Sequence, residues 1–128
     1  MNLLLDSHLL VWLSSSSERL SPVARSLIKN TDNELFFSAA SVWELAIKQS
    51  SKRTDIHVDA YLLRRGLLNN RYSELPVTGE HAVAVRALPF IHKDPFDRIL
   101  IAQATVEGFT LLTADPVVAR YPGPIRKV

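Results

Sequence analysis

The chain has 128 residues, of which 47% are hydrophobic and 22% are charged, with a formal net charge of +2 and no cysteine. These values predict one globular domain over residues 1–128 and exclude a disulfide framework, a thiolate nucleophile and a zinc–cysteine site. No apolar stretch approaches the roughly 20 residues that a membrane span needs, and the first residues lack the basic region of a signal peptide. We therefore expect a cytoplasmic protein with no membrane partner.

Short apolar runs alternate with helical patterns in the first part of the chain. Ser21 and Pro22 have the preferences of an N-cap and a first-turn residue. The predicted elements, in order, are a buried strand at 2–5, a helix at 7–13, a helix from Ser21-Pro22 to about residue 30, a strand at 35–38, a helix at 40–50 and a polar, basic loop at 50–56.

The same alternation continues to the end of the chain. The predicted elements are a helix at 58–68, a strand at 72–75 or 72–77, a helix at 78–88, a strong helix at 95–107 that Gly108 ends, a strand at 110–113, a helical turn at 116–119 and a final strand at 125–128. Short apolar strands between helices indicate an α/β, doubly wound domain, with a parallel sheet of four to five strands flanked by helices.

Four acids stand where the chain leaves the sheet. Asp6 and Asp115 directly follow the predicted strands at 2–5 and 110–113, so both lie beyond the carboxyl ends of strands. Glu44 is expected in the first turn of the helix after strand 35–38, and Asp97 at the start of a helix that leads back to strand 110–113. Connectivity therefore puts all four at the carboxyl edge, where open α/β sheets bind ligands.

Helix capping offers a simpler reason for each acid taken singly. Ser41 and Glu44 fit a capping box, while Asp94 fits an N-cap with Asp97 in the first turn. The other two acids are also natural N-caps. Because Ser41 and Asp94 would already serve as caps, capping leaves Glu44 and Asp97 free to point toward a shared site.

A cluster of carboxylates raises the pKa of its members and opposes folding. Mg²⁺ or Mn²⁺ would relieve that repulsion, because these hard ions take oxygen ligands. The chemistry expected of such a site is metal-assisted hydrolysis of a phosphodiester. The net charge of +2, without a long run of Lys or Arg, does not by itself indicate a nucleic-acid partner.

The motifs around these acids resemble PIN-domain ribonucleases, and most closely the VapC-type toxins of bacterial toxin–antitoxin pairs. The likeness runs from end to end and in order. The matching stretches are Leu-Leu-Leu-Asp-Ser-His at 3–8 with Trp12, Ser-Ala-Ala-Ser-Val-Trp-Glu-Leu-Ala-Ile-Lys at 38–48, Leu-Pro-Val at 75–77, His-Lys-Asp-Pro-Phe-Asp-Arg and its helix at 92–104, and Leu-Leu-Thr-Ala-Asp at 111–115.

The resemblance implies a Mg²⁺- or Mn²⁺-dependent endoribonuclease that acts on an RNA substrate and is inhibited by a cognate antitoxin. It also implies a homodimer and a higher toxin–antitoxin assembly. Asp6, Glu44, Asp97 and Asp115 match the family's catalytic and metal-binding acids, and Ser7 stands where the family often has threonine. The loop at 51–55 departs from the family, because it lacks the Gly-Lys-Leu sequence often found there.

Several other residues near these motifs have both a structural and a functional interpretation. Asp94 is an N-cap or an outer carboxylate beside Asp97, and Thr113 either positions water or metal or merely ends a strand. Lys48 forms an ordinary i,i+4 pair with Glu44 or contacts phosphate. His92 is a solvated loop residue or touches a partner. Trp12 and Trp43 lie on apolar helical faces, so we expect them in the core or in an interface.

Two other functions remain open from the sequence. The first is a phosphoacceptor receiver-like domain, which has a similar length and acids at the same edge. Receivers need paired acids after the first strand, whereas Asp6 stands alone. The second is a catalytically inert PIN-like domain that binds RNA or a partner protein, against which the intact set of four acids argues.

Overall fold

The computed structural model describes residues 1–51 and 58–128. Residues 52–57, which hold most of the expected polar loop and of its departure from the family sequence, lie outside the described residues. The helices and strands are β1 (Asn2–Leu5), α1 (Ser7–Ser14), α2 (Pro22–Lys29), β2 (Glu34–Ser38), α3 (Ala39–Gln49), α4 (Ala60–Asn69), β3 (Ser73–Leu75), α5 (Gly79–Ala84), the 3₁₀ turn η1 (Val85–Ala87), α6 (Pro95–Glu107), β4 (Thr110–Thr113), the 3₁₀ turn η2 (Val118–Arg120) and β5 (Ile125–Lys127).

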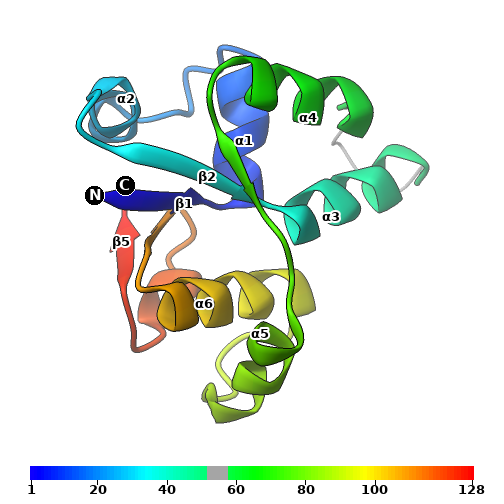
Figure 1. Ribbon diagram of the computed structural model, residues 1–128, viewed down its shortest axis with the longest axis vertical. Coiled ribbons are helices and arrows are strands. Elements are labelled where there is room, and N and C mark those ends of the chain that lie inside the picture. Colours follow the sequence, from blue (N-terminus) through cyan, green and yellow to red (C-terminus); the bar gives the residue numbers. More distant parts are fainter. Residues whose placement is uncertain (52–57) are drawn as a thin grey trace.

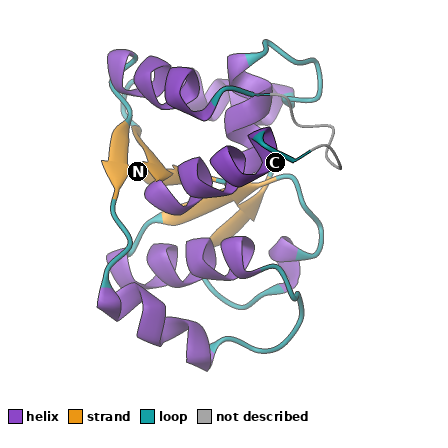
Figure 2. Ribbon diagram, turned by 90° about the vertical axis from the view of Figure 1, so that its right-hand side faces the viewer, coloured by secondary structure: helices purple, strands orange, loops and turns teal. Residues whose placement is uncertain are grey.

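The strands of the described chain form one five-stranded sheet in the order β3-β2-β1-β4-β5, and every neighbouring pair is parallel. Helices cover both faces of this sheet (Figure 1, Figure 2). The expected α/β, doubly wound class is therefore confirmed. The strand order differs from the 2-1-3-4-5 order of flavodoxin-like folds such as receiver domains. The fold therefore argues against the receiver-like alternative.

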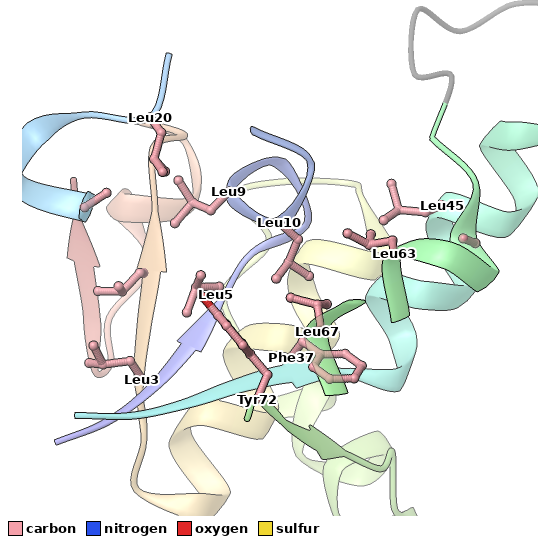
Figure 3. Packing of buried hydrophobic residues seen from close by; sticks show 13 residues of the cluster. Leu3, Leu5, Leu9, Leu10, Leu20, Phe37, Leu45, Leu63, Leu67 and Tyr72 are labelled. Carbon is pink, nitrogen blue, oxygen red and sulfur yellow. The ribbon is translucent and has the colours of Figure 1, made fainter. Parts of the chain in front are cut away.

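Alternation along β1 divides the core into two layers. Leu3 and Leu5 pack with Phe37 on one face, together with residues of α1 and α4 (Figure 3). Leu4 packs on the other face with Leu111 and with residues of α6. All five of these side chains are fully buried, and each contributes about 1.5–3 kcal/mol relative to exposure. This two-sided burial explains why the strands are continuously apolar.

Local signals set most helix boundaries. The side chain of Ser21 accepts a hydrogen bond from the Ala24 N–H and caps α2, and Gly108 ends α6 in the left-handed conformation, with φ 73°. The helix expected at 78–88 is shorter, because α5 gives way to the tighter turn η1 before Leu88-Pro89. Residues that precede a proline are driven out of the helical region. The turn expected at 116–119 is the 3₁₀ turn at 118–120.

The predicted start of α3 was wrong. Ser38 is the N-cap, and its side chain accepts a hydrogen bond from the Ala40 N–H. The helix thus begins directly at the end of β2, without an intervening loop. Glu44 consequently lies beyond the first turn, and Ser41 is a buried helical residue rather than a cap.

Among the described residues, no helix is both long enough and apolar enough to cross a bilayer.

Candidate active site

The four acids lie at the carboxyl edge of the sheet. Figure 1 shows the starts of α3 and α6 on the side toward which β1 and β2 run. The pKa of the Asp97 carboxyl is raised to about 7, first by burial and then by the negative charges of Asp94, Glu44, Asp6 and Asp115. The structure therefore brings the four predicted acids into one electrostatic neighbourhood, although they span most of the chain.

Asp6 is held by hydrogen bonds to both of its carboxylate oxygens. Oδ1 accepts the Leu9 N–H at 2.9 Å and caps α1, as the sequence predicts. Oδ2 accepts a hydrogen bond from the Thr113 hydroxyl at 2.6 Å. Asp6 is only 3% exposed, and burial raises the pKa of its carboxyl, partly opposed by the bonds from Thr113 and Leu9. The carboxylate is oriented but poorly solvated.

Glu44 sits in a buried hydroxyl network. The Ser7 Oγ lies 2.7 Å from Glu44 Oε1 and 2.9 Å from the Ser41 Oγ. A hydroxyl has one hydrogen, so donation from Ser7 to the carboxylate leaves Ser41 to donate to Ser7. Lys48 Nζ lies 2.6 Å from Glu44 Oε2. Of the two readings of Lys48, the structure therefore shows the i,i+4 pair.

Asp97 is at the third position of α6, and two side chains before the helix surround it. Asp94 caps the helix, because its Oδ1 accepts the N–H groups of Phe96 and Asp97 at 2.8 and 3.3 Å. His92 Nε2 lies 3.1 Å from Asp97 Oδ2. Ligand atoms of His92, Asp94 and Asp97 all lie within 4.8 Å of one another. Within residues 1–51 and 58–128, this is the one group of three or more His, Asp or Glu side chains whose ligand atoms lie close enough together to hold an ion as they stand.

Asp115 is joined to Asp6 through Thr113. The Thr113 Oγ1 accepts the Asp115 N–H at 3.0 Å while its own hydrogen goes to Asp6. Asp115 Oδ1 accepts the Val117 N–H at 2.8 Å and so closes the turn before η2. The predicted N-cap role of Asp115 was wrong, because Val117 is the N-cap of η2 and has no side-chain cap bond. Asp115 instead orders the preceding turn and lies at the acidic edge.

The chain matches the model of the PIN domain over residues 3–124. It belongs to the PIN domain family. It is 32% identical over 125 residues, 95% of each chain, to Ribonuclease VapC22 of Mycobacterium tuberculosis. Two similar solved structures are VapBC2 from Rickettsia felis bound to a DNA fragment from its promoter, with a TM-score of 0.70 and 17% identity, and DNA-bound VapBC from Salmonella typhimurium, with 0.68 and 16%. Both alignments cover 99% of this chain and 98% of the other.

The donors of this PIN domain fit a hard divalent cation. They are carboxylate oxygens, with the hydroxyls of Ser7 and Thr113 beside them, which is the oxygen-rich set that Mg²⁺ and Mn²⁺ prefer. The raised pKa values of Asp6 and Asp97 point the same way. Burial first, and the neighbouring negative charges after it, disfavour the ionised carboxylates, and a cation would offset that cost.

A separate apolar hollow opens on another side of the PIN domain. Its volume is about 720 Å³, and residues of α1, α2, β2 and α4 line it, including Leu13, Ile28 and Leu62, together with Tyr72 just before β3. None of the four acids lines it. Its mostly apolar walls do not suit an ion, so the acidic edge is the better candidate for a metal site.

Sequence reasoning missed the parts that support the acids. Ser41 was expected to cap a helix, and His92 was left between two readings. Nothing in the local pattern singled out Tyr121, whose hydroxyl contacts the backbone of His92. Trp43 was expected in the core or in an interface, and it is 64% exposed, with its ring edge-on to Phe96.

Proposed function

We propose that this PIN domain is an endoribonuclease that depends on Mg²⁺ or Mn²⁺ and acts as the toxin of a toxin–antitoxin pair. One observation carries the proposal: Asp6, Glu44, Asp97 and Asp115 converge at one edge of the sheet although they are far apart in the chain. The relative VapC22, named a ribonuclease, supports the same activity over nearly the whole chain.

The four acids would hold the ion, and the neighbouring hydroxyls would orient them. When bound, a divalent ion would supply Lewis-acid chemistry, lowering the pKa of a water and offsetting charge on phosphoryl oxygens. Thr113 fixes one oxygen of Asp6, and Ser7 fixes one oxygen of Glu44. Lys48 offsets part of the negative charge at Glu44. These contacts orient the carboxylates in advance, which lowers the reorganisation needed when substrate arrives.

A cleavage assay on purified protein tests the activity. We expect single-stranded RNA to be cut with Mn²⁺ or Mg²⁺ and not with EDTA. Asp6→Asn and Asp97→Asn should each lower the cleavage rate at least about 100-fold, because each removes a proposed metal ligand. Glu80→Gln, an exposed acid in the first turn of α5, is the matched control and should cleave normally. Cleavage that survives both Asn substitutions would refute the proposal.

The catalytically inert alternative makes a different prediction. A domain that keeps the fold but not the activity has no need of an ion. Isothermal titration with MnCl₂ distinguishes the two, because the enzyme should bind Mn²⁺ at or below about millimolar concentration. Absence of Mn²⁺ binding at that concentration would favour the inert domain.

We also infer that a cognate antitoxin is the protein partner. The solved structures with this fold include toxin–antitoxin complexes, among them one from Klebsiella pneumoniae. Expression of the wild type should arrest bacterial growth, and Asp97→Asn should not. Co-expression of a small protein encoded next to this chain should restore growth and co-purify with the toxin. Arrest by the Asp97→Asn variant would show that toxicity does not come from the acidic site.

A homodimer completes the proposal. On α3, Trp43 is 64% exposed and Ile47 is 45% exposed, and they are four residues apart, on one face of the helix. Burying such a face in a second copy would remove this apolar area from water. We propose that α3 contributes to the contact between the two copies.

A further inference from the structure

The segment before α6 is tied to the body of the protein through one tyrosine. The Tyr121 hydroxyl accepts the His92 N–H at 2.7 Å and donates to the His92 carbonyl at 3.2 Å. Both backbone polar groups of His92 are thus satisfied by a single side chain that lies 29 residues away in sequence. Tyr121 is only 4% exposed and packs in the core against α6, so its hydroxyl is a fixed point rather than a mobile partner.

Arg98 completes this anchor. Its Nη1 donates to the Tyr121 hydroxyl at 3.1 Å and to the Pro89 carbonyl at 2.9 Å, and its Nη2 donates to the Val85 carbonyl at 3.3 Å. The Phe90 ring covers the guanidinium, 4.9 Å from ring centre to Cζ. The hydroxyl of Tyr121 therefore makes three bonds, one donated and two accepted, which is its full capacity.

The anchored residue is the one that faces Asp97. His92 Nε2 lies 3.1 Å from Asp97 Oδ2, with the two side chains 30% and 16% exposed. Arg98 directly follows Asp97 in α6. Its guanidinium donates to the carbonyls of Val85 and Pro89, in the segment that leads from η1 to α6. The two ends of the 85–97 stretch are thereby fixed to each other. An imidazole on a free loop would sample many positions, whereas here the backbone of His92 is immobilised.

We propose that Tyr121 and Arg98 are positioning residues for the acidic site, because they fix the backbone of His92 and the imidazole of His92 fixes the orientation of the Asp97 carboxylate. This inference rests on the proposed function, since it assigns the purpose of the orientation to binding of the divalent ion. Carboxylates that bind metals depend on such outer hydrogen bonds, and losing one typically costs about 10- to 100-fold in metal affinity or activity.

The test uses Tyr121→Phe, which keeps the buried ring and removes only the hydroxyl. Its matched control is Tyr72→Phe, because Tyr72 is a similarly buried tyrosine whose hydroxyl has no partner in the described part of the chain. The first measurement is the NMR signal of the His92 ring in metal-free protein, identified by its loss in His92→Gln. We expect Tyr121→Phe and Asp97→Asn to shift this signal and Tyr72→Phe to leave it unchanged.

The second measurement is Mn²⁺ affinity by titration calorimetry, followed by cleavage of single-stranded RNA. Tyr121→Phe should bind Mn²⁺ about 10-fold or more weakly, and Tyr72→Phe should match the wild type. A double-mutant cycle makes the route explicit. If Tyr121 acts through His92, its effect on Mn²⁺ affinity should disappear in the His92→Gln background.

His92→Gln changes a partly exposed side chain, so it remains informative even if Tyr121→Phe folds poorly. It should weaken Mn²⁺ binding with no comparable loss in thermal stability. The inference would be overturned if Tyr121→Phe and His92→Gln both bound Mn²⁺ with wild-type affinity. It would also be overturned if the losses in Mn²⁺ affinity of the two single variants simply added in the double variant. A wild-type protein that neither binds Mn²⁺ nor cuts RNA would instead refute the proposed function. The His92 ring signal would still show whether Tyr121 fixes the imidazole.

Discussion

The hydroxyl of Thr113 donates a 2.6 Å hydrogen bond to Oδ2 of Asp6, although 107 residues separate the two in sequence. Parallel pairing of β1 with β4 brings them together, because Leu5 is in register with Leu112. Asp6 directly follows Leu5, and Thr113 directly follows Leu112. Hydrogen bonds of this kind favour the ionised carboxylate. Thr113 therefore opposes the effect of burial on the pKa of Asp6 and keeps that carboxylate available to a cation.

Removing the Thr113 hydroxyl should weaken both folding and metal binding. Thr113→Val keeps the shape of the side chain but leaves Oδ2 of Asp6 without a donor and the Asp115 N–H without its acceptor. We expect a loss of about 1–3 kcal/mol in the free energy of unfolding, measured with urea, and weaker Mn²⁺ binding. Thr105→Val, at an exposed threonine that bonds within its own helix, is the control. Equal effects at both positions would contradict this role.

The stability of the metal-free protein should fall as the pH rises. Folding raises the pKa of Asp97 from 3.8 to about 7, so the folded state binds the proton more tightly than the unfolded state. The stabilisation is fully present below about pH 4 and is lost as the pH rises through about 7. One pKa unit corresponds to about 1.4 kcal/mol, so we expect a decrease of more than about 1 kcal/mol, measured by thermal unfolding in EDTA.

Asp97→Asn supplies the control for this pH dependence. Asparagine does not ionise, so the variant should have a flatter profile and, in EDTA at pH 8, a higher melting temperature than the wild type. Asp6, whose pKa is also raised, should leave a residual slope of the same sign. With saturating Mn²⁺ the wild type should have the higher melting temperature of the two proteins, because only the wild type retains the full set of ligands. A wild-type profile that rises between pH 4 and 7 would contradict the raised pKa.

Lys48→Met should make stability depend on the metal. The substitution removes the partner of Glu44, whose side chain is only 4% exposed, while that of Lys48 is 31% exposed. We expect a loss of about 1–3 kcal/mol without metal, less than for a fully buried pair, and partial recovery with Mn²⁺. Arg64→Met breaks the more exposed pair with Glu74 and should change stability far less, because solvent screens exposed ion pairs, with no response to Mn²⁺.

Trp43→Ser should dissociate the proposed homodimer. The indole is 64% exposed in the single chain, and large aromatic side chains often dominate the binding energy of an interface. Light scattering after gel filtration should give twice the chain mass for the wild type and the chain mass for the variant. Tyr61→Ser, at a similarly exposed aromatic residue of α4, should remain dimeric. A monomeric wild type would remove the basis for this interface.

Features that depend on neighbours in the chain could be predicted from the sequence. The strands, the caps at Asp6, Ser21 and Asp94, and the stop at Gly108 follow from the period of apolar residues and from local backbone preferences. The start of α3 was misjudged because Ser38 and Ser41 offer equally good caps. Their choice depends on where β2 ends, and pairing of Ser38 with Leu75 of β3 decides that.

The sequence by itself determined that the chain alternates strands with helices, and hence that four acids lie at one edge. That much follows from connectivity, since a helix leaving a parallel strand starts at its carboxyl end. Only the tertiary structure decided the carboxylate partners that come from other parts of the chain: Thr113 for Asp6, Ser7 for Glu44, and His92 for Asp97. Such contacts depend on side-chain direction across separate elements, which the packed sheet and helices set and no local pattern records.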